Sequence, residues 1–190
     1  MLYEISRLLA AFLFKLVFRF EVEGKDSIPK HTSFILASNH LSYLDPIVLG
    51  IACPRKLYFL AKQELFRNKL ISFFLKRVDA IPLRRGKTDV LAIKSALQIL
   101  GKGKPLVIFP QGTRDQMLTK VFPGVGYLFM KTDSPVVISR ISGTDKILPK
   151  GRKFLRPHRI KVIFKKIEGL KKSDSYEVTS CKVLDEIKNT

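Results

Sequence analysis

The chain has 190 residues, the length of one ordinary domain, which is enough to bury a hydrophobic core without disulfides or a structural metal. It carries 35 Lys and Arg against 16 Asp and Glu, a net charge of +19, so its partners should be anionic: nucleic acid, an anionic membrane or phosphorylated substrates. The two cysteines lack paired spacing and the three histidines form no ligand cluster, which indicates reduced thiols in the cytoplasm and argues against a metal.

Residues 1–19 predict an amphipathic helix rather than a signal peptide or a membrane span. Their apolar run contains Arg7, Lys15 and Arg19, and no small-residue cleavage site follows it. At about 100° per residue, these cations share one narrow stripe while large apolar side chains cover the rest of the helix. Such a helix lies in a membrane interface or is buried against the protein, and its cations favour the membrane.

Residues 20–190 predict one α/β domain, because short strands alternate with helices and no linker or repeat interrupts them. Runs rich in β-branched and aromatic residues, typical of strands, stand at 18–24, 33–38, 56–61, 80–83, 106–110, 136–141 and 159–164. Helical periodicity covers 46–52, 64–78, 88–100, 124–132 and 175–189. This alternation indicates a mixed, largely parallel sheet flanked by helices, with ligands at the carboxyl ends of the strands.

A histidine and an aspartate follow the strand expected at 33–38, within NHLSYLD (39–45). Asp45 before Pro46 is typical of a helix N-cap, a reading that needs no catalytic role. A carboxylate has two oxygens, however, so Asp45 could also accept a hydrogen bond from His40 Nδ1 and leave Nε2 as a general base. With no GxSxG nucleophile elbow in the chain, that base would act on a substrate hydroxyl. From this spacing alone, a helix cap and a catalytic pair both stay open.

Two basic clusters follow later strands. RRGKT (84–88) lacks the first glycine of a Walker loop, since Ile81 stands at that position, yet Arg84 and Arg85 offer forked donors to a phosphate. In QGTRD (111–115), a flexible glycine, a hydroxyl and a permanent cation favour an anion site. The alternatives are a solvated basic loop for the first cluster and a plain turn for the second.

The segment 146–172 holds eleven Lys and Arg and one acid, Glu168. This density suits an anionic lipid surface or an acidic carrier protein, and a solvated basic surface stays open as well. The aromatic residues stand in apolar helices and strands rather than among the basic residues, which argues against nucleic acid.

Taken in order, the three polar clusters resemble the 1-acylglycerol-3-phosphate acyltransferases, the lysophosphatidate acyltransferase family. NHLSYLD matches the NHxxxxD block of that family, DAIPLRRGKTD looks like its GxIPxxR block, and FPQGTRD resembles FPEGTR. The resemblance spans roughly residues 20–145. Three positions depart from the family pattern: Gln111 replaces a glutamate, Asp79 a glycine and Ile138 a proline.

The resemblance implies a glycerol-3-phosphate acyltransferase-like fold and the synthesis of phosphatidic acid from a lysophospholipid and an acyl thioester. His40 would be the general base on the free hydroxyl, and Asp45 would orient it. Arg85 and the loop 112–114 would hold the phosphate of the acceptor. The full set of implied substrate-binding residues is Asn39, Arg84, Arg85, Gln111, Gly112, Thr113 and Arg114. Neither a cofactor nor a metal is implied, because acyl-coenzyme A or acyl-carrier protein is the acyl-donor substrate.

The basic segment, the N-terminal helix and the Phe-rich helix expected at 64–78 predict a peripheral or monotopic enzyme on the cytoplasmic face of the cell membrane. Its partners would be the lysophospholipid, the acyl thioester, the anionic membrane surface and, as one of the two donors, acyl carrier protein, without nucleic acid. Two alternatives stay open. Gln111 favours another lysolipid acceptor, such as a lyso-ornithine lipid, and the charge alone permits a non-catalytic protein that binds lipid or nucleic acid.

Overall fold

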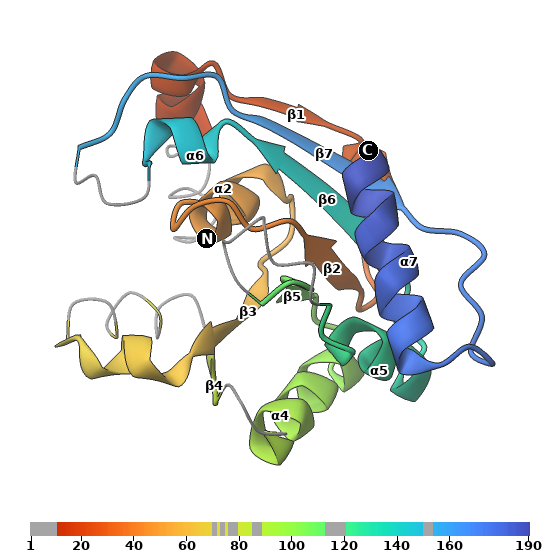
Figure 1. The fold of residues 1–190 in the computed structure, drawn as a ribbon. Helices are drawn as coiled ribbons and strands as arrows, with labels where there is room; N and C mark the ends of the chain where they lie inside the picture. The colour runs from red at the N-terminus through yellow and green to blue at the C-terminus, as the bar shows by residue number, and fades with distance from the viewer. Residues whose placement is uncertain are drawn as a thin grey trace.

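The computed structural model describes residues 11–69, 72, 75, 80–84, 89–112, 121–149 and 154–190. In this part of the chain seven strands form one sheet, in the order β1-β7-β6-β2-β5-β3-β4 (Figure 1). The strands are β1 (Glu21–Glu23), β2 (Ile35–Ser38), β3 (Tyr58–Lys62), β4 (Ile81–Leu83), β5 (Leu106–Ile108), β6 (Val136–Ser142) and β7 (Lys161–Lys166). Each corresponds to a predicted strand.

The sheet is mixed and largely parallel, as predicted. Strands β6, β2, β5, β3 and β4 run parallel to one another, whereas β7 pairs antiparallel with β6 and parallel with β1. The carboxyl ends of β2, β5 and β6 therefore meet at one edge of the sheet. In register, Ile35 lies opposite Leu106 of β5 and Val136 of β6.

Helices cover both faces of the sheet (Figure 1). One face carries α4 (Val90–Gly101), α5 (Gly124–Lys131) and α7 (Tyr176–Asn189), and the other carries α2 (Asp45–Ala52), α6 (Thr144–Ile147) and a helix at 11–18. Strand β2 is buried on both faces, which explains its uninterrupted apolar sequence. Leu36 packs in the core beneath α2, while Ile35 and Ala37 pack in the core beneath α4, α5 and α7.

Two predicted elements differ in extent. Residues 11–18 are helical because the rings of Phe14 and Phe18 contact each other, tilted by 59° with 5.1 Å between centroids, and pack into the core, so β1 begins only at Glu21. Arg19, at φ 45°, ends this helix. The helix predicted at 64–78 begins as a 3₁₀ helix, η2 (Gln63–Arg67), and most of its remainder lies outside the described residues. Residues 1–10 of the predicted amphipathic helix also lie outside them.

Two short helices have no counterpart in the predicted elements: η1 (Lys25–Ser27) and α6. Elements of three and four residues are too short to show a helical period. Among the described residues, no helix is both long enough and apolar enough to cross a bilayer.

Candidate active site

His40 and Asp45 form a hydrogen-bonded pair just beyond the carboxyl end of β2. Asp45 Oδ2 lies 2.8 Å from His40 Nδ1, and the Asp45 side chain is fully buried while that of His40 is 15% exposed. A carboxylate only accepts hydrogen bonds, so Nδ1 carries a proton, and in the neutral imidazole Nε2 has the lone pair. The predicted contact is confirmed, and the catalytic role of the pair stays a prediction.

Asp45 does not cap the helix that follows, and that prediction was wrong. Helix α2 begins at Asp45 itself, its N-cap is Leu44, and no side chain caps it. The carboxylate turns back instead, and Oδ2 accepts the N–H groups of Leu41 at 2.6 Å and of Ser42 at 2.8 Å. Because one oxygen holds both of these groups and the imidazole, the carboxylate organises the turn between β2 and α2 rather than the first turn of α2.

A residue absent from the predicted site completes the contacts of this carboxylate. Thr144, the first residue of α6, is buried, and its hydroxyl donates to Asp45 Oδ1 at 2.6 Å. The sequence carries a usable signal, since Thr144 follows β6 and polar residues after strands are candidates for a site. The signal requires knowing that β6 lies beside β2, which no local pattern reveals.

Phe109, also absent from the predicted site, links His40 to a cavity. Its ring stacks on the imidazole, with 4.2 Å between ring centroids and 22° between the planes. Phe109 also belongs to the wall of a cavity of about 690 Å³, which is bounded by β3, β4, β5, α4 and α5. Most of the wall is apolar: Leu60, Leu83, Val90, Ala92, Ile93, Ala96, Ile108, Phe122, Pro123 and Leu128. The volume and the apolar wall suit an apolar group.

Two predicted substrate-binding residues line the same cavity. Arg84 is held there by its Nε, which donates to Gln63 Oε1 at 2.8 Å, and by its backbone N–H, which donates to Asp89 at 2.7 Å. Gly112 has φ 62°, and a Cβ at this position would lie 2.8 Å from the Phe122 ring. Glycine is therefore required where the chain leaves β5.

The remaining predicted substrate-binding residues are Asn39, Arg85, Gln111, Thr113 and Arg114. Gln111 is half-buried in the turn after β5. The side chain of Asn39 pairs with the backbone of Ile141, donating to its carbonyl at 2.8 Å and accepting its N–H at 2.7 Å. This pairing joins the ends of β2 and β6, and contact of Asn39 with substrate stays a prediction. Three of them lie outside the described residues: Arg85, Thr113 and Arg114.

Asp89, the N-cap of α4, is a carboxylate with a shifted pKa that lines the cavity. Its carboxylate accepts N–H groups from Arg84 and Ala92, which hold the pKa of that carboxyl below its ordinary value of 3.8. Within the described ranges no group of three or more His, Cys, Asp and Glu side chains could hold a metal ion. An imidazole whose Nδ1 is held by a carboxylate can transfer a proton at Nε2 to or from a bound group.

Comparison with known proteins connects this geometry to a family. A sequence model of the Acyltransferase family matches residues 19–142. The chain is 29% identical over 144 residues to the 1-acyl-sn-glycerol-3-phosphate acyltransferase of Bacillus subtilis, covering 75% of this chain and 70% of that protein. It is also 29% identical to the chloroplast enzyme LPAT1 of Arabidopsis thaliana, covering 88% of this chain and 49% of the plant protein.

A solved structure is similar in fold. The 1-acyl-sn-glycerophosphate acyltransferase PlsC of Thermotoga maritima superposes with a TM-score of 0.68 at 24% identity, over 98% of this chain and 81% of that one. The matched segment 19–142 runs from the end of the helix at 11–18 to the end of β6 and contains His40, Asp45 and Gly112. Since this segment is well over half of the 190 residues, the chain belongs to the acyltransferase family.

Proposed function

We propose that this chain transfers a fatty acyl group from an acyl thioester to the free hydroxyl of 1-acylglycerol-3-phosphate, giving phosphatidic acid. The observation that carries the proposal is His40, an imidazole whose Nδ1 is engaged by a buried carboxylate and whose ring stacks on the wall of an apolar cavity. The names of the relatives support the same acceptor.

In the proposed reaction His40 is the general base and Asp45 fixes its orientation. Nε2 takes the proton of the acceptor hydroxyl as the hydroxyl oxygen attacks the thioester carbonyl carbon. The new ester C–O bond forms, the C–S bond breaks, and the leaving thiolate recovers a proton from the imidazolium. The Asp45 carboxylate stabilises that imidazolium while it carries the extra charge.

The cavity provides a place for an acyl chain. Each CH₂ group moved from water into such an apolar space contributes about 0.8 kcal/mol. Arg84 lies at its rim, so a chain in the cavity leaves an attached phosphate near a permanent cation. We assign the remaining phosphate contacts to Arg85 and to Gly112, Thr113 and Arg114, as the sequence predicts.

The test is release of free thiol from acyl-coenzyme A, and from acyl-carrier protein, when lysophosphatidate is added to the purified full chain. Phosphatidic acid should appear in step with the thiol, as measured by mass spectrometry of the lipid extract. Cys181 is an exposed free thiol and Cys53 a buried one, so a Cys181→Ser background removes the signal of the exposed thiol of the protein from the thiol assay. Comparing kcat/KM for the two donors identifies the preferred one.

The same assay separates the alternatives. A lysolipid panel that includes lyso-ornithine lipid tests the other acceptor, which Gln111 favours because it lacks the charge of glutamate. Vesicle binding without thiol release, for every lysolipid and donor in the panel, would leave only a non-catalytic lipid-binding protein.

We further propose that the chain works as a peripheral or monotopic protein on the cytoplasmic face of the membrane, with residues 1–19 as its membrane-associating helix and 20–190 as its acyltransferase domain. The described part of that helix presents Phe12, Leu13, Leu16 and Val17 to solvent. Its last residue, Phe18, accepts a backbone hydrogen bond from Ile160 at 3.1 Å, which ties the helix to the segment 154–160.

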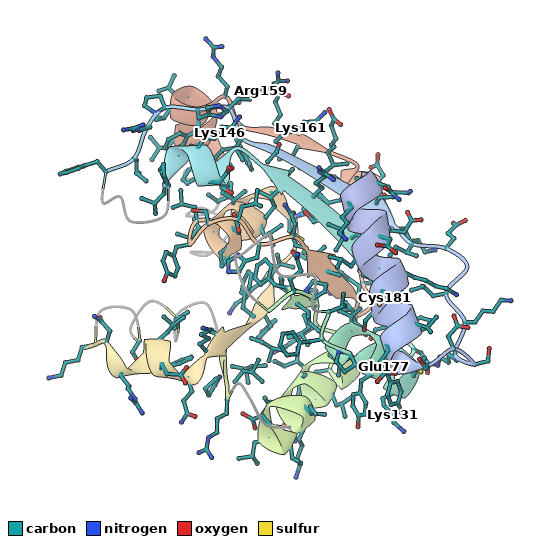
Figure 2. All side chains as sticks on the ribbon, viewed as in Figure 1. Lys131, Lys146, Arg159, Lys161, Glu177 and Cys181 are labelled. Atoms are coloured by element: carbon teal, nitrogen blue, oxygen red, sulfur yellow. The ribbon has the colours of Figure 1, made fainter. Side chains whose placement is uncertain are left out.

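That segment adds a second apolar projection. Phe154 is 85% exposed, and its neighbour Leu155 is exposed as well. Figure 2 shows Lys146 and Arg159 at the end of the molecule where the helix at 11–18 lies. Exposed apolar side chains surrounded by cations suit an anionic membrane interface, where the side chains enter the acyl boundary and the cations meet head groups.

A further inference from the structure

The Asp45 carboxylate is held from two directions that come from distant parts of the chain. Oδ2 serves the local turn, where it accepts from Leu41, Ser42 and His40. Oδ1 points the other way and accepts the hydroxyl of Thr144, 99 residues further along. Among the described residues, Thr144 is the one hydrogen-bond partner of Oδ1.

This second contact holds the carboxylate by its other oxygen. Rotation about the Cβ–Cγ bond moves both oxygens, so the donor on Oδ1 acts together with the three donors on Oδ2 to keep the carboxylate plane in one orientation. Asp45 is fully buried, so an unpaired Oδ1 would have no water to replace the hydroxyl. The direction of the His40 ring follows the position of Oδ2, because Nδ1 is hydrogen-bonded to that atom.

The backbone around Thr144 is itself closely constrained. Gly143 has φ 89°, and a Cβ there would lie 2.0 Å from the carbonyl oxygen of Arg159, so only glycine allows this turn. Two residues before it, Ile141 is paired with Asn39 at the end of β2. The pairing of Ile141 with Asn39 thus attaches the turn that holds Thr144 to the segment just before His40. Thr144 lies two residues beyond the segment that matches the family.

We infer that Thr144 is a positioning residue for the acyl transfer, which acts through Asp45 by fixing the carboxylate that orients His40. The inference rests on the proposed function. It assigns to Thr144 an effect on turnover rather than on substrate binding, because its hydroxyl bonds Asp45 and Thr144 is not among the residues that line the cavity.

The test compares Thr144→Val, which keeps the shape and removes the hydroxyl, with Thr144→Ser, which keeps the hydroxyl. We expect kcat of Thr144→Val to fall by about tenfold to a hundredfold, as for a small misplacement of a reacting group, with KM for both substrates nearly unchanged. Thr144→Ser should retain the kcat of the wild type within about threefold. The matched control is Thr179→Val in α7, a buried threonine whose hydroxyl has no partner among the described residues, and it should keep full activity.

A double-mutant cycle shows whether Thr144 acts through Asp45. In an Asp45→Asn background, Thr144→Val should change kcat by less than about twofold, since the carboxylate that it orients is already gone. A full additional loss in that background would assign Thr144 a general structural role and overturn the inference.

Failure of this inference is distinguishable from failure of the proposed function. If the wild type releases no thiol with any acceptor, the proposed function fails. If the wild type is active and Thr144→Val matches its kcat, the role of Thr144 is overturned while the acyltransferase stands. Circular dichroism checks that each variant is folded. Should Thr144→Val not fold, Thr144→Ala, which removes the hydroxyl without a second methyl group at Cβ, takes its place, and wild-type kcat in that variant overturns the inference equally.

Discussion

At the level of single residues, the charge of Asp45 and its hydrogen bonds can be separated. An asparagine at this position can keep its carbonyl oxygen on the N–H groups of Leu41 and Ser42 and turn its amide toward the Thr144 hydroxyl, which can also accept. The turn between β2 and α2 can therefore form without the negative charge. What an asparagine cannot do is stabilise an imidazolium at His40.

We predict that Asp45→Asn lowers kcat of acyl transfer by about a hundredfold or more, and that His40→Ala removes general-base catalysis altogether, typically a factor of about 10² to 10⁴. Both variants should fold and bind vesicles as the wild type does. The measurements are steady-state thiol release and thermal unfolding by circular dichroism. Wild-type turnover in a folded His40→Ala variant would remove His40 from the mechanism.

The part of this site that could be predicted from sequence consists of residues that lie close together along the chain. His40 and Asp45 are five residues apart, so a strand that ends before one and a helix that begins near the other bring them together. Thr144 and Phe109 reach the same point only because β6 and β5 flank β2 in the sheet. The cap predicted for Asp45 failed because the backbone N–H groups of the tight turn competed for the same carboxylate.

At the level of elements, the turn from β6 into α6 controls the position of Thr144. This turn exists because Gly143 adopts φ 89° and passes directly beside the backbone of Arg159, at the start of the chain leading into β7. All seven strands could be predicted from β-branched and aromatic runs, but neither the order of the strands nor the antiparallel pairing of β7 has a local signature. Helix α6, with four residues, has none either.

We predict that Gly143→Ala destabilises the fold by at least about 1–3 kcal/mol, because an alanine at this φ is strained and its Cβ would contact the Arg159 carbonyl. It should also lower kcat by displacing Thr144. Thermal unfolding and thiol release measure the two effects. Gly101→Ala is the matched control, since nothing lies within 4 Å of a Cβ at the end of α4, and it should leave both quantities near wild type. Equal unfolding temperatures for the two variants would contradict the constraint on the turn.

At the level of the whole molecule, the net charge of +19 and the exposed apolar side chains both favour the proposed binding to an anionic membrane. The helix at 11–18 and the segment 154–160 meet where Ile160 bonds Phe18, whereas α7 covers the opposite face of the sheet (Figure 1). The chain contains no tryptophan, so a single introduced tryptophan reports on its own surroundings without background.

We predict that Phe154→Trp shows a blue-shifted emission with anionic phospholipid vesicles and is quenched by lipids brominated along their acyl chains. Val178→Trp, at an exposed position on α7, should show neither change. Added salt should weaken the binding, because the cations lose their attraction to the head groups. Equal quenching of the tryptophan in the Val178→Trp and Phe154→Trp variants would show that the membrane does not meet the proposed face.

The contact between Asp45 and Thr144 also has a consequence for how the protein is made. Synthesis from the N-terminus produces His40 and Asp45 early, but the hydroxyl that holds the carboxylate and the Ile141 backbone that pairs with Asn39 are added about a hundred residues later. Contacts of such long sequence separation form slowly, because a large loop must close first. Until β6 and Thr144 have left the ribosome, a nascent chain therefore contains both proposed catalytic residues but lacks the contacts that orient them.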